Sequence, residues 1–321
     1  MAKLLSKNLD WVGLMRLIIA ILFTMTVSGA NASQSWQDTI SIVAKKADRL
    51  TAIGRRRGGG FLGTAYNELY VKEHSCSILG RMLGKKQHIL KIEKETNIAP
   101  NSAHEFLVAG RSLANWVYNA KRILKRTRSE KIIEWNLDCA GKLGIASNEV
   151  ITDLSEETFY RVDGDVLYIL GDINEGFFSR LKAAYLKSPN VNSVALGSGG
   201  GDINEAMKAA NFIREQKLNT TLWNNCYSAC TLVFMGGVKR RIMSPYPSLM
   251  FHKASLPSGV EIPRGTGLYS MISAFVASMG GNGEKFTRYM LSSAPHQFTK
   301  APTAELCAAK FATWVQRLCG F

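Results

Sequence analysis

The same five residues, Gly-Asp-Ile-Asn-Glu, occur at positions 171–175 and again at 201–205, 30 residues later. Each copy follows a short apolar run and precedes a helical pattern, which predicts two strands and two helices: 166–170, 193–196, about 174–186 and about 204–215. A strand and a helix that recur at this spacing favour successive turns of a right-handed β/α spiral. The alternative is a common strand-to-helix turn used twice by coincidence.

Each copy also contains the two acids of a capping box. Asp172 and Asp202 are expected to accept hydrogen bonds from the first backbone N–H groups of the following helix. The Glu three residues later is expected to reach back to the N-cap. Both junctions are therefore predicted to be helix starts built in the same way.

Residues 33–138 follow a different pattern, with apolar residues three and four apart and few β-branched runs. Ser102-Ala103-His104-Glu105 is a further capping box, and an apolar stripe follows it. These features predict an all-helical region before the β/α part. The β/α domain is expected to span 139–321.

Positive charge is concentrated in the helical region. The chain has a net charge of +15, nine units of which lie between residues 33 and 150, most densely at 121–128. One interpretation is binding to an anionic envelope surface. The other is a solvated helix face that keeps the protein soluble. No stacking aromatic residues alternate with these basic residues, so nucleic acid is not expected as a partner.

The N-terminus has the three parts of a signal peptide. Basic residues precede an apolar run at 17–27, and Ala30-Asn31-Ala32 follows as a cleavage site. A run of this length is short for a membrane span. We predict that residues 1–32 are a signal peptide cleaved after Ala32 and that the protein is periplasmic or secreted. An uncleaved, membrane-anchoring helix is the alternative.

Six cysteines follow the predicted cleavage site, an even number in a compartment where disulfides persist. A bridge between Cys307 and Cys319 would fasten the C-terminus, and one between Cys226 and Cys230 would brace the turn at Ser228. Pairings that involve Cys76 or Cys139 stay open. The Cys-x3-Cys spacing is too wide for a usual zinc knuckle. No metal and no cofactor are expected.

A glycine run, 197–201, lies between the second strand and its helix. Backbone N–H groups in such a turn can bind phosphate or stabilise an oxyanion. The phosphate interpretation lacks the required motifs, because no G-x-x-x-x-G-K-[ST] is present and Asp202 occupies the last position of G-x-G-x-x-G. A tight turn between a strand and a helix would explain one glycine better than four.

The next strand, 220–223, leads to a small apolar helix that begins at or next to Ser228. A serine at a helix start is commonly an N-cap. His252 ends another short apolar strand, 248–252, and a histidine there can be a satisfied core residue. The Gly-rich turn, the serine and the histidine together suggest nucleophilic catalysis instead.

In this order, the elements resemble the Clp protease and crotonase-like superfamily, and more closely its exported Clp-like proteins. The resemblance covers about 162–313 and implies a Clp/crotonase-like right-handed ββα spiral. It also implies Ser228 as nucleophile and His252 as general base. The oxyanion hole would come from the amides of Ala229 and of the glycine turn, Gly200 with Gly201 as a further candidate.

The family's third catalytic residue, an Asp, has no counterpart here. His296 occupies its position, and no Asp follows Asp202 in the chain. Without a carboxylate the histidine loses the group that orients it. Catalysis is then expected from a Ser-His dyad, or is lost. Glu261, in the loop after His252, is a candidate substitute.

We therefore predict an exported serine hydrolase that acts on a peptide or another acyl substrate. The alternative is a catalytically inactive Clp-like fold that serves as an envelope binding or assembly protein. Chemistry on a coenzyme A thioester is disfavoured, since an exported protein rarely meets that cofactor. Family members often assemble into rings, so a homo-oligomer is a further expectation.

Overall fold

The computed structural model describes residues 29–60, 68–84, 100–140 and 159–320. The described residues divide into two compact units, which are treated separately below: residues 29–60 with 100–125, and residues 68–84 with 126–140 and 159–320. The helices of residues 68–82 and 128–140 group with the strands in the second unit. The predicted domain boundary at 138/139 stays a prediction.

The predicted signal peptide lies outside the described residues as far as residue 28. The first described helix begins at Gly29, so the expected cleavage site after Ala32 falls in its first turn. Cleavage stays a prediction. Within the described ranges, no helix combines the length and the apolar character needed to span a bilayer.

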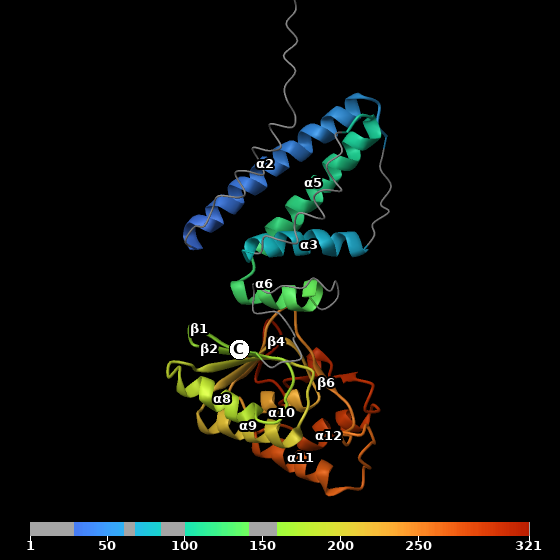
Figure 1. The fold of residues 1–321 in the computed structure, drawn as a ribbon. Coiled ribbons are helices and arrows are strands. Elements are labelled where there is room, and N and C mark those ends of the chain that lie inside the picture. The colour runs from blue at the N-terminus through green and yellow to red at the C-terminus, as the bar shows by residue number, and fades with distance from the viewer. Residues whose placement is uncertain (1–28, 61–67, 85–99, 141–158, 321) are drawn as a thin grey trace, which may run out of the picture. The chain divides into compact units, whose positions relative to one another are not determined.

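The first unit is built from two long helices, α2 (Gly29–Arg56) and α5 (Ala103–Leu124) (Figure 1). They approach closely at Gly110, where an added Cβ would lie 3.0 Å from the carbonyl oxygen of Ala47. The rings of Trp36 and Trp116 stack with centroids 6.3 Å apart. Ser102 and Glu105 form the predicted capping box at the start of α5, so that prediction is confirmed.

The second unit combines helices with an eight-stranded sheet. Its helices are α3 (Glu68–Met82), α6 (Arg128–Glu134), the π-helix η1 (Trp135–Ala140), α8 (Phe177–Leu186), α9 (Ile203–Glu215), α10 (Ala229–Met235), α11 (Gly267–Ser278), α12 (Gly283–Leu291) and the 3₁₀ turn η2 (Thr303–Glu305). Its strands are β1 (Phe159–Asp163), β2 (Val166–Leu170), β3 (Ser193–Ser198), β4 (Asn219–Tyr227), β5 (Arg240–Ile242), β6 (Leu249–Phe251), β7 (Thr299–Lys300) and β8 (Trp314–Val315).

The sheet is mostly parallel, which confirms the predicted alternation of strands and helices. Strands β2, β3, β4, β5 and β8 run parallel in that order, while β1 and β7 add antiparallel pairs. Strand β4 forks: Thr220 and Thr221 pair with β5, whereas Cys226 and Tyr227 pair with β6. The fork places the end of β4 beside the end of β6.

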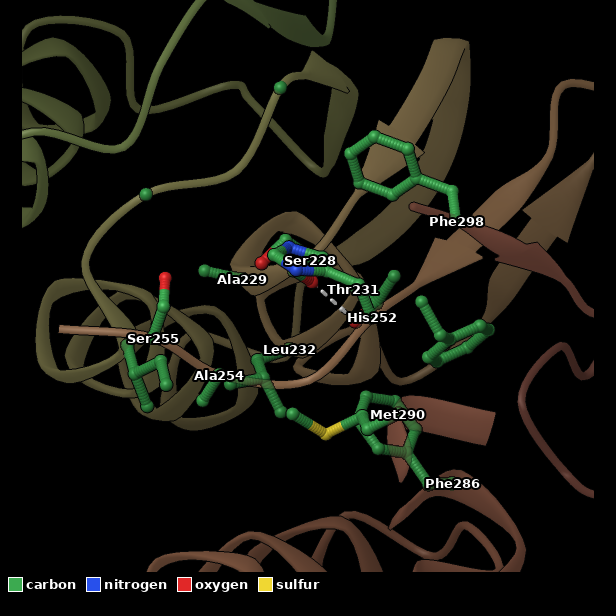
Figure 2. Close-up of a pocket in the computed structure, with 14 residues that line it drawn as sticks. Ser228, Ala229, Thr231, Leu232, His252, Ala254, Ser255, Phe286, Met290 and Phe298 are labelled. Carbon is green, nitrogen blue, oxygen red and sulfur yellow. Dashed lines mark hydrogen bonds between the residues drawn. The ribbon is translucent and has the colours of Figure 1, made fainter. Parts of the chain in front are cut away.

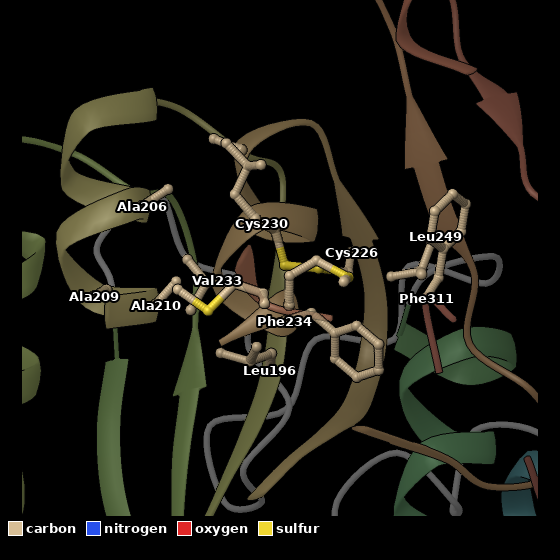
Figure 3. Packing of buried hydrophobic residues seen from close by; sticks show 14 of the residues in the cluster. Leu196, Ala206, Ala209, Ala210, Cys226, Cys230, Val233, Phe234, Leu249 and Phe311 are labelled. Carbon is tan, nitrogen blue, oxygen red and sulfur yellow. A yellow bond between two sulfur atoms is a disulfide. The ribbon is translucent and has the colours of Figure 1, made fainter. Parts of the chain in front are cut away.

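Successive side chains of β2 enter different cores, as the period of a strand requires. Leu167 and Ile169 join the large core that packs under α8–α12, and Tyr168 and Leu170 pack with Ile133 of α6 on the other face. The strands are therefore buried on both faces, which explains their continuous apolar runs. Figure 3 shows the large core, where the alanines of α9 face α10.

The two Gly-Asp-Ile-Asn-Glu copies lie side by side but differ in structure. Ile173 and Gly201 form a parallel bridge, and the Ile173 N–H donates to the carbonyl of Gly200 at 2.7 Å. In the second copy Asp202 accepts from the Glu205 N–H at 2.8 Å, as predicted. In the first copy the capping prediction is wrong, because the bridge keeps the chain extended after Asp172. Helix α8 begins only after Gly176, which makes no side-chain capping hydrogen bond.

The Glu of the second copy does not complete the predicted capping box, because it does not reach back to its own N-cap. The Glu205 carboxylate accepts from the backbone N–H of Phe178, in the first turn of α8, at 3.0 Å. One side chain of the second copy thus caps the helix that follows the first copy.

All six cysteines are paired. Cys76–Cys139 joins α3 to η1, with Cα atoms 5.6 Å apart. The other two bridges are the ones named from the sequence: Cys226–Cys230, with Cα atoms 5.3 Å apart, and Cys307–Cys319, 6.4 Å apart. Within the described residues, no cluster of three metal-binding side chains occurs.

Candidate active site

Ser228 occupies a strained turn between β4 and α10. Its backbone has φ 52° and ψ −125°, a conformation that non-glycine residues rarely adopt. Although it stands at the N-cap position, its side chain makes no capping hydrogen bond. The simple N-cap interpretation therefore fails, and strain of this kind concentrates at functional sites.

Several interactions hold this turn in place. The Ser228 N–H donates to the carbonyl of Met250 at 2.8 Å, and the Thr231 hydroxyl donates to the Ser228 carbonyl at 2.6 Å. The Cys226–Cys230 disulfide closes the turn across its base, and both cysteines are fully buried. The backbone of Ser228 is thus held from both sides of the turn.

His252 follows directly after β6, whose pairing with β4 sets Tyr227 opposite Met250. Both Ser228 and His252 line one cavity of about 270 Å³, which Figure 2 shows. Within the described part of the chain, no hydrogen bond joins the Ser228 hydroxyl to the imidazole. Such bonds are often long without substrate and shorten when it binds.

The imidazole of His252 is half-buried and poorly paired. Its Nδ1 is buried without a hydrogen-bond partner, whereas Nε2 is not among the buried unpaired atoms. Burial lowers the pKa of His252 below its usual value, and backbone groups of Lys253 and Pro295 oppose this shift. The neutral imidazole that a lowered pKa favours is the form that can accept a proton.

The glycine turn lies against Ser228. Gly200 has φ 105°, and a Cβ there would stand 2.7 Å from the Ser228 Cβ, so only glycine fits. The Gly200 N–H already donates to the Ser198 hydroxyl at 3.1 Å, and Gly200 does not line the cavity. Gly201 and Ala229 do line it. The first N–H groups of a helix, such as that of Ala229, have no intrahelical partner and are available to an anion.

Neither acid-position candidate bonds to the imidazole, because its Nδ1 has no hydrogen-bond partner. His296 is exposed and does not line the cavity. The Glu261 carboxylate binds the Lys253 ammonium at 2.8 Å and is also absent from the cavity lining. Neither residue therefore takes the place of the missing Asp in this conformation.

The rest of the cavity is mainly apolar, and sequence reasoning did not find it. Besides the residues already placed, the lining consists of Gly199, Ile203, Thr231, Leu232, Phe251, Ala254, Ser255, Phe286, Met290 and Phe298. Of these, Phe298 could have been noticed in the sequence. It follows His296 by two residues, and His296 occupies the position expected for the third catalytic residue. Phe286 and Met290 come from α12, whose packing the sequence pattern did not locate.

Comparisons with known proteins do not assign the chain to a family. No protein-family model matches it, and no curated protein matches its sequence. Among solved structures, a mutant of ClpP1 from Listeria monocytogenes aligns with a TM-score of 0.38 and 15% identity, over 48% of this chain and 91% of that one. A likeness at this score carries no conclusion about activity.

Proposed function

We propose that the protein is a serine hydrolase that cleaves a peptide or another acyl bond. Ser228 is the nucleophile, His252 the general base, and the N–H groups of Gly201 and Ala229 the oxyanion donors. The observation that carries the proposal is the strained Ser228 turn, whose hydroxyl caps nothing and shares a cavity with His252 and the glycine turn.

The chemistry follows from these positions. The Ser228 oxygen attacks the carbonyl carbon while its proton passes to Nε2 of His252. The carbonyl oxygen becomes an anion, which the two N–H groups stabilise. When the intermediate collapses, His252 returns the proton to the leaving group and an acyl-enzyme remains. Water, deprotonated by the same imidazole, then hydrolyses the ester and regenerates Ser228.

A second candidate is a binding or assembly protein that keeps this fold without catalysis. The observation that favours it is the unpaired Nδ1 of His252, because no carboxylate lines the described cavity. In a well-studied serine protease, replacing the orienting Asp by Asn lowers kcat by about 10⁴-fold. A hydrolase of this kind is accordingly expected to be slow.

We further propose that the β/α part is a Clp/crotonase-like domain and that the protein acts outside the cytoplasm. Support for the fold comes from the mostly parallel sheet and from the order of glycine turn, serine and histidine. Support for the location comes from the three disulfides, which are rare in reducing compartments.

Labelling with a fluorophosphonate serine probe tests the proposed hydrolase. Wild type is expected to be labelled, Ser228→Ala not at all, and His252→Ala at least about 100-fold more slowly, as expected for loss of a general base. Ser255→Ala is the matched control, since Ser255 lines the same cavity and has no assigned role. Absence of wild-type labelling across pH 5–9, or undiminished labelling of Ser228→Ala, would exclude Ser228 as a nucleophile and leave the binding protein.

A further inference from the structure

We propose that Phe298 is a positioning residue for His252, whose ring holds the imidazole in the orientation that a carboxylate would otherwise impose. The inference rests on the proposed hydrolase function and assigns the orienting role that neither His296 nor Glu261 fills. Phe298 contacts the base and does not itself react.

The contact geometry supports this assignment. The Phe298 and His252 rings meet nearly edge to face, with centroids 5.0 Å apart and an interplanar angle of 74°. The Tyr227 ring meets Phe298 in the same manner at 4.9 Å. Phe298 therefore lies between His252 and the residue before Ser228, and both Phe298 and His252 line the cavity (Figure 2). Edge-to-face pairs have a preferred geometry and add to packing.

The segment that carries Phe298 is fastened to the strand before His252. Thr299 pairs with Phe251 in the β6–β7 ladder, and the Lys253 N–H donates to the carbonyl of Ser293 at 3.0 Å. The chain from 293 to 299 is thus tied on both sides of His252. A ring on such a segment can hold the imidazole although Phe298 itself is 43% exposed.

An aromatic ring and a carboxylate orient a histidine in different ways. A carboxylate accepts the Nδ1 proton and stabilises the imidazolium, so it raises the basicity of the ring. Phe298 offers no acceptor, and the buried Nδ1 has no hydrogen-bond partner. The lowered pKa of His252 agrees with such an environment, and the backbone of Pro295 opposes the shift. His252 would then be a weaker base that is already neutral at lower pH.

The ionisable side chains on the neighbouring elements include Tyr227, Lys253, Glu261, Tyr289, His296 and Lys300. The Lys253–Glu261 pair carries no net charge, and His296 and Lys300 are exposed. Tyr227 contacts Phe298, and Tyr289 contacts Phe251 rather than the imidazole.

The test compares Phe298→Ala and Phe298→Tyr with the wild type, and uses Met290→Leu as a control at another cavity-lining position. The pKa of the His252 imidazole is measured by NMR, with its signals assigned from a His252→Gln variant. The pH dependence of fluorophosphonate labelling is measured in parallel. Thermal unfolding of each variant checks that it folds.

For Phe298→Ala we expect the His252 pKa to rise toward about 6.5, its unperturbed value, because water reaches Nδ1. The labelling plateau should fall by about 3- to 10-fold, the size of an aromatic pair interaction. Phe298→Tyr should restore both quantities, and Met290→Leu should leave the His252 pKa unchanged.

An unchanged His252 pKa in Phe298→Ala, or a Phe298→Tyr variant as impaired as Phe298→Ala, overturns the proposal. The two proposals can fail separately. If no variant is labelled but the His252 pKa still depends on the ring at position 298, the hydrolase proposal fails while the contact is upheld. If labelling is normal and independent of position 298, only the positioning role is lost.

Discussion

The two halves of the candidate site are supported unequally. The Ser228 turn is held by a disulfide, by a backbone bond to Met250 and by the hydroxyl of Thr231. His252 has a buried Nδ1 without a partner and one aromatic contact. The proposed nucleophile is thus fixed by covalent and hydrogen bonds, whereas the proposed base contacts one aromatic ring and backbone groups of Lys253 and Pro295 and has no partner at Nδ1. If the protein is the proposed hydrolase, its weaker half is the histidine rather than the serine.

Among the substitutions that test this comparison, Gly200→Ala is expected to have the largest effect. It alters the better supported half of the site. The added methyl group would meet the Ser228 Cβ at 2.7 Å, and φ 105° strains any other residue. We expect a loss of unfolding free energy of about 2–5 kcal/mol from overpacking and backbone strain. Labelling should fall by about 100-fold, since an error of about 1 Å in placement can cost that much.

Gly259→Ala is the matched control for this substitution. Gly259 has a similar φ of 83°, but nothing lies within 4 Å of its added Cβ. Only the backbone cost of about 1–2 kcal/mol should appear, with labelling unchanged. Equal labelling of the two variants would mean that Gly200 does not support the Ser228 turn.

A smaller effect is expected when the brace of the turn is removed. The double substitution of Cys226 and Cys230 by Ala should lower the unfolding free energy by about 2 kcal/mol, and that of Cys307 and Cys319 by about 3 kcal/mol, because the second loop is longer. Labelling should instead fall by about tenfold in the Cys226 and Cys230 double variant and stay unchanged in the Cys307 and Cys319 double variant. Urea unfolding and labelling rates measure the two effects, and equal labelling losses would contradict the bracing role.

The smallest effect is expected from His296→Asp, which restores the residue type of the resembled family. His296 is exposed and outside the cavity, so a carboxylate there is screened by solvent. Labelling should change by less than about twofold. A gain of tenfold or more would show that this segment can carry the acid to His252, and the contrast between the two halves would then depend on one side chain.

Much of the second unit was predictable from local pattern. The strands that precede each Gly-Asp-Ile-Asn-Glu copy, the helix after Ser228 and the position of His252 at the end of β6 all agree with the structure. Buried parallel strands leave continuous apolar runs, and glycine is required where Gly200 meets Ser228. Apart from the contact between Gly200 and Ser228, these features depend on residues near one another in the chain.

The features that sequence reasoning missed depend on pairing between distant segments. The capping box predicted at Asp172 was wrong because Ile173 bridges to Gly201 of the second copy. Two identical five-residue segments cannot reveal which of them keeps its N-cap. The contact between Phe298 and His252 depends on the β6–β7 ladder, whose second strand, Thr299–Lys300, is too short to be recognised. The partner of Glu205 lies 27 residues away, on another helix.

That bond from Glu205 to the N–H of Phe178 also bears on how the unit assembles during synthesis. Helix α8 is made first, but the carboxylate that satisfies its first turn is added 27 residues later. Until the second repeat has left the ribosome, α8 has an incomplete start, and short helices of this length are marginal in isolation. The two repeats are therefore expected to fold as one unit, and a chain truncated between them should not keep the first.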